Sequence, residues 1–233
     1  MMLGELSRAL AAEPRDLEHL RCLVLEANAL GKSTAAARSG SLRHLRSLYG
    51  LGAHSEVTDA LRVVWPLEAD GRPIIGLLCA LARDPLLRDS CHPVLGAPLG
   101  QRVSAGEIAE TLARLHMGRF TPAMLKSLSQ NCASTWTQSG HLTGKVKKQR
   151  TRARPTPAAA AYAAYLASLA GFGGPALIAS PWLDVLDVAA SERLSLLRRA
   201  ESEGLVRVRA AGDVVEVVVE PLHAKVGPEF ALA

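Results

Sequence analysis

Apolar side chains recur every three or four residues along most of the chain, which is the spacing of one face of an α-helix. Some segments begin with a residue that accepts hydrogen bonds from a free helix N-terminus, such as Ser104 followed by Glu107. The chain is therefore expected to be mainly α, a bundle of amphipathic helices. The pattern predicts helices over residues 16–28, 34–49, 56–64, 73–82, 104–118, 121–137, 157–170 and 191–203, with a short helix or two between 174 and 188.

The first two predicted helices, 16–28 and 34–49, are separated by a short turn that contains Gly31. The second of them carries polar and basic side chains on its outer face. This order is the outline of a helix-turn-helix unit, whose second helix enters the major groove of DNA. A plain structural pair of helices has the same outline, so both interpretations stay open. The nucleic-acid contacts predicted for this unit are Lys32, Ser33, Thr34, Arg38 and Arg43.

The C-terminal third ends in a different pattern. Residues 205–209 and 214–219 are rich in Val, and a turn with Gly212 and Asp213 separates them, which predicts a β-hairpin. A small hairpin that follows the helix 191–203 is typical of a winged helix, in which the hairpin is the wing. The alternative is a helical domain with an incidental hairpin.

These patterns divide the chain into four parts. We expect a helix-turn-helix-like unit over residues 1–65 and a central helical region over residues 66–140. A basic connecting segment over residues 141–155 leads to a C-terminal winged-helix-like unit over residues 156–233.

The charge distribution singles out the basic connecting segment. The chain has a formal net charge of +5, and one stretch of ten positions holds six basic residues and no acidic one. Alternating positions within it favour an extended chain, and an extended basic chain suits contact with phosphates. A solvated linker, a membrane-surface contact and an acidic protein partner are the alternatives. The six residues are Lys145, Lys147, Lys148, Arg150, Arg152 and Arg154, and Trp136 and His141 before them are read either as base-stacking or as buried side chains.

Residues 155–183 carry no charged side chain, and that length is enough to span a membrane. The stretch is rich in small residues, and the run GFGGP at 171–175 divides it into two short pieces. We therefore expect a buried helix, a turn and a second element, with no membrane insertion. The N-terminus meets acidic residues too early for a signal peptide, and the four cysteines lack the spacing of a zinc site. We therefore expect a cytoplasmic protein whose cysteines are reduced and mostly buried.

The sequence lacks the common catalytic motifs. It contains no G-x-G-x-x-G, no P-loop, no H-E-x-x-H and no G-x-S-x-G, and its seven His residues do not share a metal-binding spacing. Asp184 and Asp187 lie three residues apart and are interpreted as a solvated helix face. No catalytic residue, metal ligand or cofactor is predicted.

Several stretches resemble a known bacterial family when they are taken together. They are EANALGKSTAAARSGSLRHLRSLYGL, IIGLLCALARDPLLRDS, CASTWTQSGHLTGKVKKQR and SERLSLLRRAESEGLVRV. Over most of its length the chain resembles the BrxA-type proteins of BREX phage-defence clusters. The resemblance implies a small, mainly helical, non-enzymatic nucleic-acid-binding protein with likeness to the NusB antitermination fold. It supplies no catalytic residues.

We therefore expect a non-enzymatic protein that binds nucleic acid, with double-stranded DNA favoured, as an accessory component of a phage-defence complex. Its partners would be nucleic acid and other defence-system proteins. One alternative is an assembly adaptor that binds partner proteins without contacting nucleic acid. Another is a NusB-like RNA-binding protein.

Overall fold

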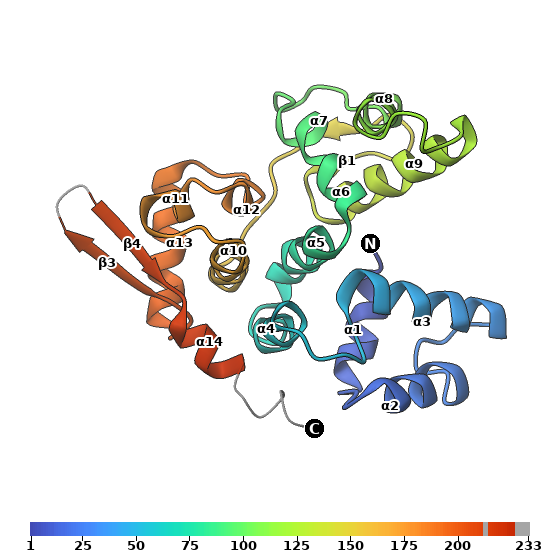
Figure 1. Ribbon diagram of the computed structural model, residues 1–233, viewed down its shortest axis with the longest axis horizontal. Coiled ribbons are helices and arrows are strands. Elements are labelled where there is room, and N and C mark those ends of the chain that lie inside the picture. Colours follow the sequence, from blue (N-terminus) through green and yellow to red (C-terminus); the bar gives the residue numbers. More distant parts are fainter. Residues whose placement is uncertain (212–213, 227–233) are drawn as a thin grey trace.

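The structure is a computed structural model in which residues 1–211 and 214–226 are described (Figure 1). The protein is mainly helical, as the sequence predicted for its fold class. The described residues also form two small antiparallel sheets of two strands each, whereas the predicted fold class contained one hairpin. One hydrophobic core runs through all parts of the chain, from Leu6 near the N-terminus to Leu222 near the C-terminus.

The N-terminal helices lie together at one corner of the molecule (blue in Figure 1). They are α1 (Leu3–Ala11), α2 (Leu17–Arg21), a π-helical turn (Cys22–Glu26) and α3 (Ala35–Tyr49). The prediction of one α-helix over 16–28 was wrong in its second half, where the wider turn replaces α-helix and Ala27 N–H donates to the Cys22 carbonyl at 3.0 Å. Thr34 caps the beginning of α3, as the sequence predicted, and Gly50 caps its end with a φ of 67° that suits glycine.

The central elements form two groups, the helices in the middle of the molecule and an arm that projects from it. α4 (Glu56–Val64), a 3-10 turn (Ala69–Gly71) and α5 (Arg72–Arg83) precede the short helices α6 (Pro85–Asp89) and α7 (Cys91–Leu95). α8 (Ala105–Leu115) and α9 (Pro122–Gln138) pack along each other as the arm (Figure 1). The predicted capping box is confirmed, because Ser104 and Glu107 exchange side-chain and backbone hydrogen bonds.

The uncharged segment forms the most buried helix, α10 (Pro157–Leu169). Residues 157–167 are all buried, because α10 packs against α4 and α5 on one side and against α12 and α13 on another. A helix surrounded in this way tolerates no charge, so the predicted buried helix is confirmed. Among the residues that the structure describes, no helix combines the length and the apolar composition needed to cross a bilayer.

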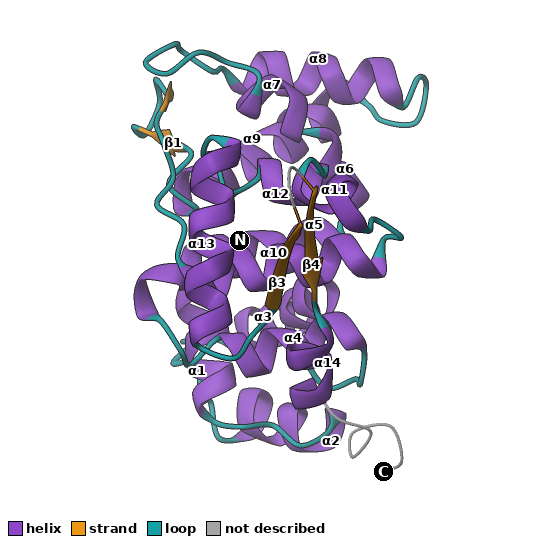
Figure 2. Cartoon of the chain, turned by 90° about the vertical axis from the view of Figure 1, so that its left-hand side faces the viewer, coloured by secondary structure: helices purple, strands orange, loops and turns teal. Residues whose placement is uncertain are grey.

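The C-terminal elements cover α10. They are α11 (Gly174–Ile178), α12 (Pro181–Asp184), α13 (Ala190–Ser202), the hairpin β3 (Arg207–Ala211) and β4 (Val214–Val218), and α14 (Glu220–Val226) (Figure 2). β3 and β4 pair antiparallel from Arg207↔Val218 to Ala211↔Val214, so the predicted hairpin is confirmed. The turn residues Gly212 and Asp213 lie outside the described residues. The winged-helix assignment stays a prediction.

Helices from different predicted parts of the chain pack against each other. α10 contacts α4 and α5, and α14 contacts α4. The division into four parts stays a prediction from the sequence. Of the four cysteines, Cys79 and Cys132 are buried, Cys91 is half-buried and Cys22 is exposed, so the expectation of mostly buried cysteines holds for only part of the set.

Candidate nucleic-acid interface

The basic segment folds as a β-hairpin. β1 (Leu142–Thr143) pairs antiparallel with β2 (Gln149–Arg150), with Leu142 opposite Arg150. Gly144 opens the turn with a φ of 95°, and a side chain there would collide with the backbone oxygen of Lys147. Glycine is therefore required at this position. The segment is extended at Gln149–Arg150, as predicted for part of it, whereas Lys145 and Lys147, whose alternation also suggested a strand, lie in the turn.

A third backbone segment holds the other edge of β2. The Arg150 carbonyl accepts from Gly100 N–H at 2.8 Å, and Arg150 N–H donates to the Gln101 carbonyl at 2.8 Å. Val103 N–H donates to the Lys148 carbonyl at 3.0 Å. β2 therefore lies between two hydrogen-bonded neighbours, which a solvated linker would not have. The root of the hairpin is fixed while its turn projects.

The turn presents the lysines to solvent. Lys145, Val146 and Lys147 are exposed, and Val146 keeps 92% of its surface accessible. Lys148 is half-buried, and its Nζ donates to Thr137 Oγ1 at 2.7 Å, at the end of α9. Within the described part of the chain, none of the three lysines forms an ion pair with a carboxylate. Their charge is therefore open to an external anion.

Arg150 does not belong to this surface. It is only 3% exposed, and its Nη2 and Nη1 lie 2.5 and 2.9 Å from the two carboxylate oxygens of Asp187. Asp187 also accepts from Ala153 N–H at 3.1 Å. The assignment of Arg150 to phosphate contact is therefore corrected: its charge is neutralised internally. The prediction that Asp187 is solvated was also wrong, since its side chain is 15% exposed.

The corrected role of Arg150 is to attach the hairpin root to the segment after α12. This partner was invisible in the sequence because it lies 37 residues away. Asp184, which was predicted to share a solvated helix face with Asp187, is half exposed and lies 2.7 Å from Arg193 Nη2. The two carboxylates thus serve separate ion pairs.

Trp136 and His141 are buried, so the base-stacking interpretation is corrected in favour of the buried one. Their rings meet edge-on at 5.0 Å. His141 hydrogen-bonds Ser139 Oγ at 2.8 Å and the Val185 carbonyl at 2.9 Å. Burial lowers the pKa of His141 to about 4, and the neutral imidazole becomes part of the support beneath the hairpin.

Arg152 and Arg154 follow β2 on an extended chain. Both are exposed, while Ala153 between them is 3% exposed and faces inward. The two arginines line a cavity of about 770 Å³ together with the exposed hydroxyl group of Thr143, and Asp70 is a carboxylate among the lining residues. This arrangement puts two more cations beside the hairpin, next to groups that can donate hydrogen bonds to a phosphate.

The cations predicted on the N-terminal unit are only partly available. Lys32 Nζ lies 2.5 Å from Glu5 Oε1, and this bond holds the pKa of Glu5 below its usual value. The Thr34 hydroxyl caps α3 by accepting from Ala37 N–H at 3.1 Å. Both side chains therefore already form contacts within the protein. The sequence did not reveal the contact of Lys32, because its partner Glu5 lies on α1, which was not predicted. Ser33 and Arg43 are exposed, and Arg38 is half-buried.

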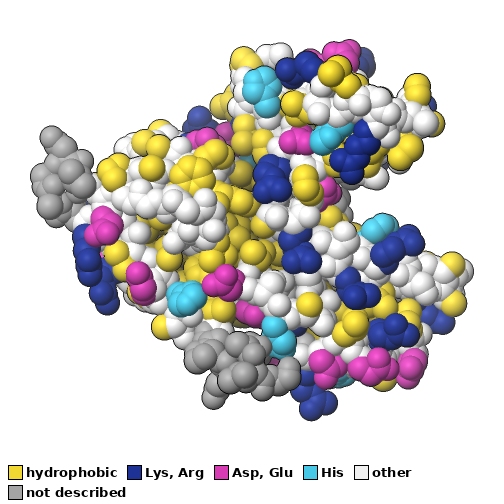
Figure 3. Space-filling model, in the orientation of Figure 1, with side chains coloured by type: hydrophobic (Ala, Val, Ile, Leu, Met, Phe, Trp, Pro, Cys, Tyr) yellow, Lys and Arg dark blue, Asp and Glu magenta, His cyan; other side chains and the backbone are white. Residues whose placement is uncertain are grey.

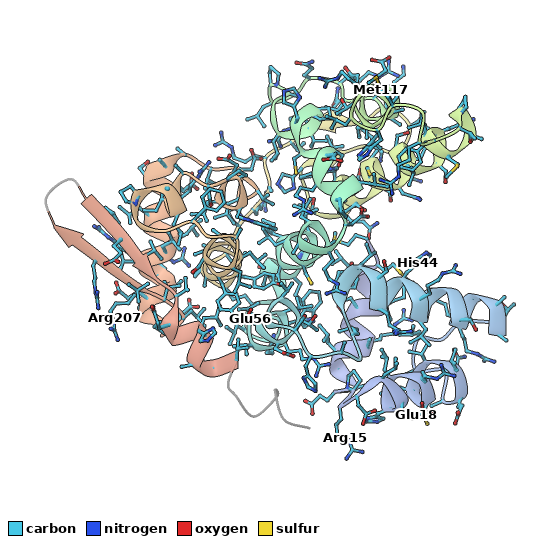
Figure 4. All side chains as sticks on the ribbon, viewed as in Figure 1. Arg15, Glu18, His44, Glu56, Met117 and Arg207 are labelled. Carbon is cyan, nitrogen blue, oxygen red and sulfur yellow. The ribbon has the colours of Figure 1, made fainter. Side chains whose placement is uncertain are left out.

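The outer face of α3 borders a hollow in the molecular surface. Figure 3 shows this hollow between the N-terminal helices and the α8–α9 arm, with Lys and Arg side chains along it. His44 on α3 lies on the side that faces the arm (Figure 4). The hairpin and the N-terminal unit are separate surfaces, so the structure does not merge the two predicted sets into one site.

Other exposed cations lie outside the predicted set, and sequence reasoning missed them. Arg102 is exposed beside β2, and Arg114, Arg119 and Lys126 are exposed on the arm. For the three cations of the arm the signal was present in the sequence, because residues 111–183 contain no Asp or Glu. A count of clustered basic residues overlooks such scattered cations. A search for long stretches without acidic residues would have found them.

Comparisons with protein-family models, curated proteins and solved structures found no match for this chain. The resemblance to BrxA-type proteins therefore stays a prediction. The functional proposal rests on the geometry and charge of the chain itself.

Proposed function

We propose that the protein binds nucleic acid through the β1–β2 hairpin, without catalysing a reaction, and that double-stranded DNA is its preferred ligand. The observation that carries the proposal is a hairpin anchored at its root whose exposed lysines have no acidic partner in the described part of the chain. A role as an accessory component of a cytoplasmic phage-defence complex, beside other defence proteins, is the further part of the proposal that the sequence resemblance supports.

The hairpin has the shape and the charge for this ligand. The major groove of B-DNA admits a two-stranded β-ribbon, and phosphates line both of its edges. Lys145 and Lys147 occupy the tip, and Arg152 and Arg154 lie behind the root on the extended chain that follows β2. Because the root is already held in place, little conformational freedom would be lost on binding.

The direct test is fluorescence anisotropy with duplex DNA, single-stranded DNA and duplex RNA of equal length at several salt concentrations. The test variant replaces Lys145, Lys147, Arg152 and Arg154 with Ala. If each cation contacts one phosphate, the slope of log K against log salt should fall by about 3.6, at about 0.9 per contact. Arg150 is left intact so that the fold is preserved.

The control variant removes the same charge elsewhere, by replacing Arg198, Arg199, Arg207 and Arg209 with Ala. These side chains are exposed on α13 and β3. We expect the control to keep most of the slope. Equal losses in both variants would show that net charge alone drives binding, and an unchanged slope in the hairpin variant would remove the proposed role. Preference for duplex RNA over duplex DNA would select the NusB-like RNA-binding alternative.

One observation favours the adaptor alternative. Leu115, Met117 and Met124 are 52%, 86% and 48% exposed around the tip of the α8–α9 arm. Exposed apolar side chains gathered in this way are typical of protein contacts. Binding to purified defence-system proteins that is lost when Leu115 and Met117 become Ser, together with no binding to any nucleic acid, would support the adaptor.

A further inference from the structure

A second cavity lies between α1 and the end of α4, in the half of the molecule opposite the β1–β2 hairpin (Figure 1). Its volume is about 520 Å³, which falls within the range of pockets that hold small molecules. The last turn of α1, the bend over residues 13–15 and the segment after α4 form its walls. The nucleic-acid proposal makes no use of this site.

The walls are largely apolar. Leu10 and Ala11 contribute from α1, Pro14 from the bend, and Trp65 and Pro66 from the end of α4. Pro14 and Trp65 are buried, with Trp65 only 5% exposed. Rigid rings and an aliphatic side chain form a surface that favours a flat or aliphatic ligand body.

Three guanidinium groups line the same cavity, from Arg15, Arg62 and Arg72, and Glu13 is the carboxylate among its lining residues. Arg72 Nε donates to the Trp65 carbonyl at 3.2 Å, and its guanidinium carbon lies 5.6 Å from the centre of the Trp65 ring. These two contacts hold the Arg72 side chain in place. The cavity therefore has an excess of positive charge next to an apolar wall.

One N–H group of Arg62 lacks a hydrogen-bond acceptor. Its Nε is shielded from solvent and has no hydrogen-bond partner among the described residues. Asp59, one helical turn earlier, is the nearest carboxylate on α4; burial raises its pKa, while the charges of His54 and Arg62 lower it. Asp59 does not line the cavity, and Arg62 forms no ion pair within 4 Å in the described part of the chain. A shielded guanidinium N–H without a protein acceptor can be satisfied by a water, an ion or the acidic group of a ligand.

We propose that this cavity binds a small organic anion. The aromatic or aliphatic body of the ligand lies against Leu10, Pro14 and Trp65, and its acidic group pairs with Arg62 and Arg72. Guanidinium groups recognise carboxylate, sulfonate and phosphate oxygens in the same planar, often bidentate way. Arg15, which Figure 4 shows near the beginning of α2 at the edge of the molecule, stands at the rim.

The probe for the test is 8-anilinonaphthalene-1-sulfonate, whose fluorescence rises when its aromatic body leaves water. The full chain should show one saturable site. Arg62→Gln and Arg72→Gln should each weaken binding by about tenfold, the usual scale for losing one charge-assisted contact. Ala11→Phe, which fills the cavity from the exposed side of α1, should abolish binding. Arg21→Gln, on α2 and outside the cavity, is the matched control and should bind like the wild type.

Three further results decide the case, with thermal unfolding used to verify that each variant is folded. Undiminished dye binding in both Gln variants and in Ala11→Phe would overturn the inference. So would equal binding of N-phenyl-1-naphthylamine, which has the same body without the sulfonate. Displacement of the dye by duplex DNA would assign the cavity to a nucleic-acid surface and overturn the inference as well.

Competition identifies the acidic group. Phenyl phosphate or benzoate should displace the dye from the wild type, and the better competitor shows whether phosphate or carboxylate is preferred. Failure of both at concentrations far above that of the dye would contradict the proposal. The result is independent of whether the hairpin binds DNA.

Discussion

The two hairpins of this protein have similar basic sequences and different surroundings. β1–β2 carries Lys145 and Lys147 in its turn, and β3–β4 carries Arg207 and Arg209 on one strand. In the second hairpin, Arg209 lies opposite Glu216 with 3.7 Å between Nη1 and Oε2. In the first, no carboxylate among the described residues pairs with a turn lysine. The neighbours of a cation therefore decide whether its charge is available to a ligand.

The hairpins also differ in what makes them rigid. β3–β4 has a ladder of five residue pairs. β1–β2 has two, which is too few for a stable isolated hairpin, and it relies on the Arg150–Asp187 pair and the bonds to residues 100–103. One basic residue of the segment is thus used to hold the others in position.

The largest expected effect concerns this anchor. Arg150→Ala should lower the free energy of unfolding by about 3–5 kcal/mol, because it leaves the carboxylate of Asp187 shielded and without its partner. Arg152→Ala removes a neighbouring exposed charge and should change the free energy of unfolding by less than about 0.5 kcal/mol. Chemical denaturation measures both. Equal small effects would mean that the hairpin root does not depend on the pair.

The second expectation is a pH dependence that originates beneath the first hairpin. Burial lowers the pKa of His141 to about 4, although Asp187 raises it and Arg150 lowers it further. The unfolded state takes up a proton near pH 6.5 and the folded state does not, so the free energy of unfolding should fall as the pH drops from 6.5 to 4. The loss is on the order of 3 kcal/mol.

The control for this dependence is His44, an exposed residue on α3. Denaturation midpoints between pH 7 and 4 should become less pH-dependent in His141→Gln, measured relative to its own stability at pH 7. They should keep the wild-type dependence in His44→Gln. Parallel curves for the wild type and His141→Gln would contradict the assignment.

A third expectation concerns the turn of the first hairpin. Gly144→Ala forces a side chain into a backbone with φ of 95° and against the Lys147 carbonyl, a change that costs about 1–3 kcal/mol locally. The turn should lose its geometry, so duplex affinity should fall by about fivefold or more while α10 stays protected from hydrogen exchange. Gly4→Ala, which meets nothing within 4 Å on α1, should leave the affinity unchanged.

The smallest expected effect tests the charge balance of the second hairpin. The side chains of Arg209 and Glu216 are 61% and 51% exposed, so a double-mutant cycle should give a coupling below about 1 kcal/mol. Glu216→Gln should nevertheless free Arg209, and the salt slope for duplex binding should rise by about 0.9 if Arg209 then meets a phosphate. No rise would show that balance by Glu216 is not what separates the two hairpins.

Much of the fold was readable from the sequence because the relevant forces act over a few residues. The periodicity placed α4 at Glu56–Val64, and capping residues marked the beginnings of α3, α8 and α9. The uncharged stretch correctly predicted the buried helix α10. α1 was missed because no side chain caps it at Met2, and the π-helical turn was missed because its sequence keeps the apolar spacing of an α-helix.

The candidate site was readable only in outline. The sequence by itself determined where the positive charge is concentrated and that glycines and alternation favour turns and extended chain there. Only the tertiary structure decided which charges are paired inside the protein, since Asp187 contacts Arg150 and Glu5 contacts Lys32 across long separations in sequence. The physical reason is that ion pairing and burial depend on distance in space, whereas periodicity and capping depend on distance along the chain.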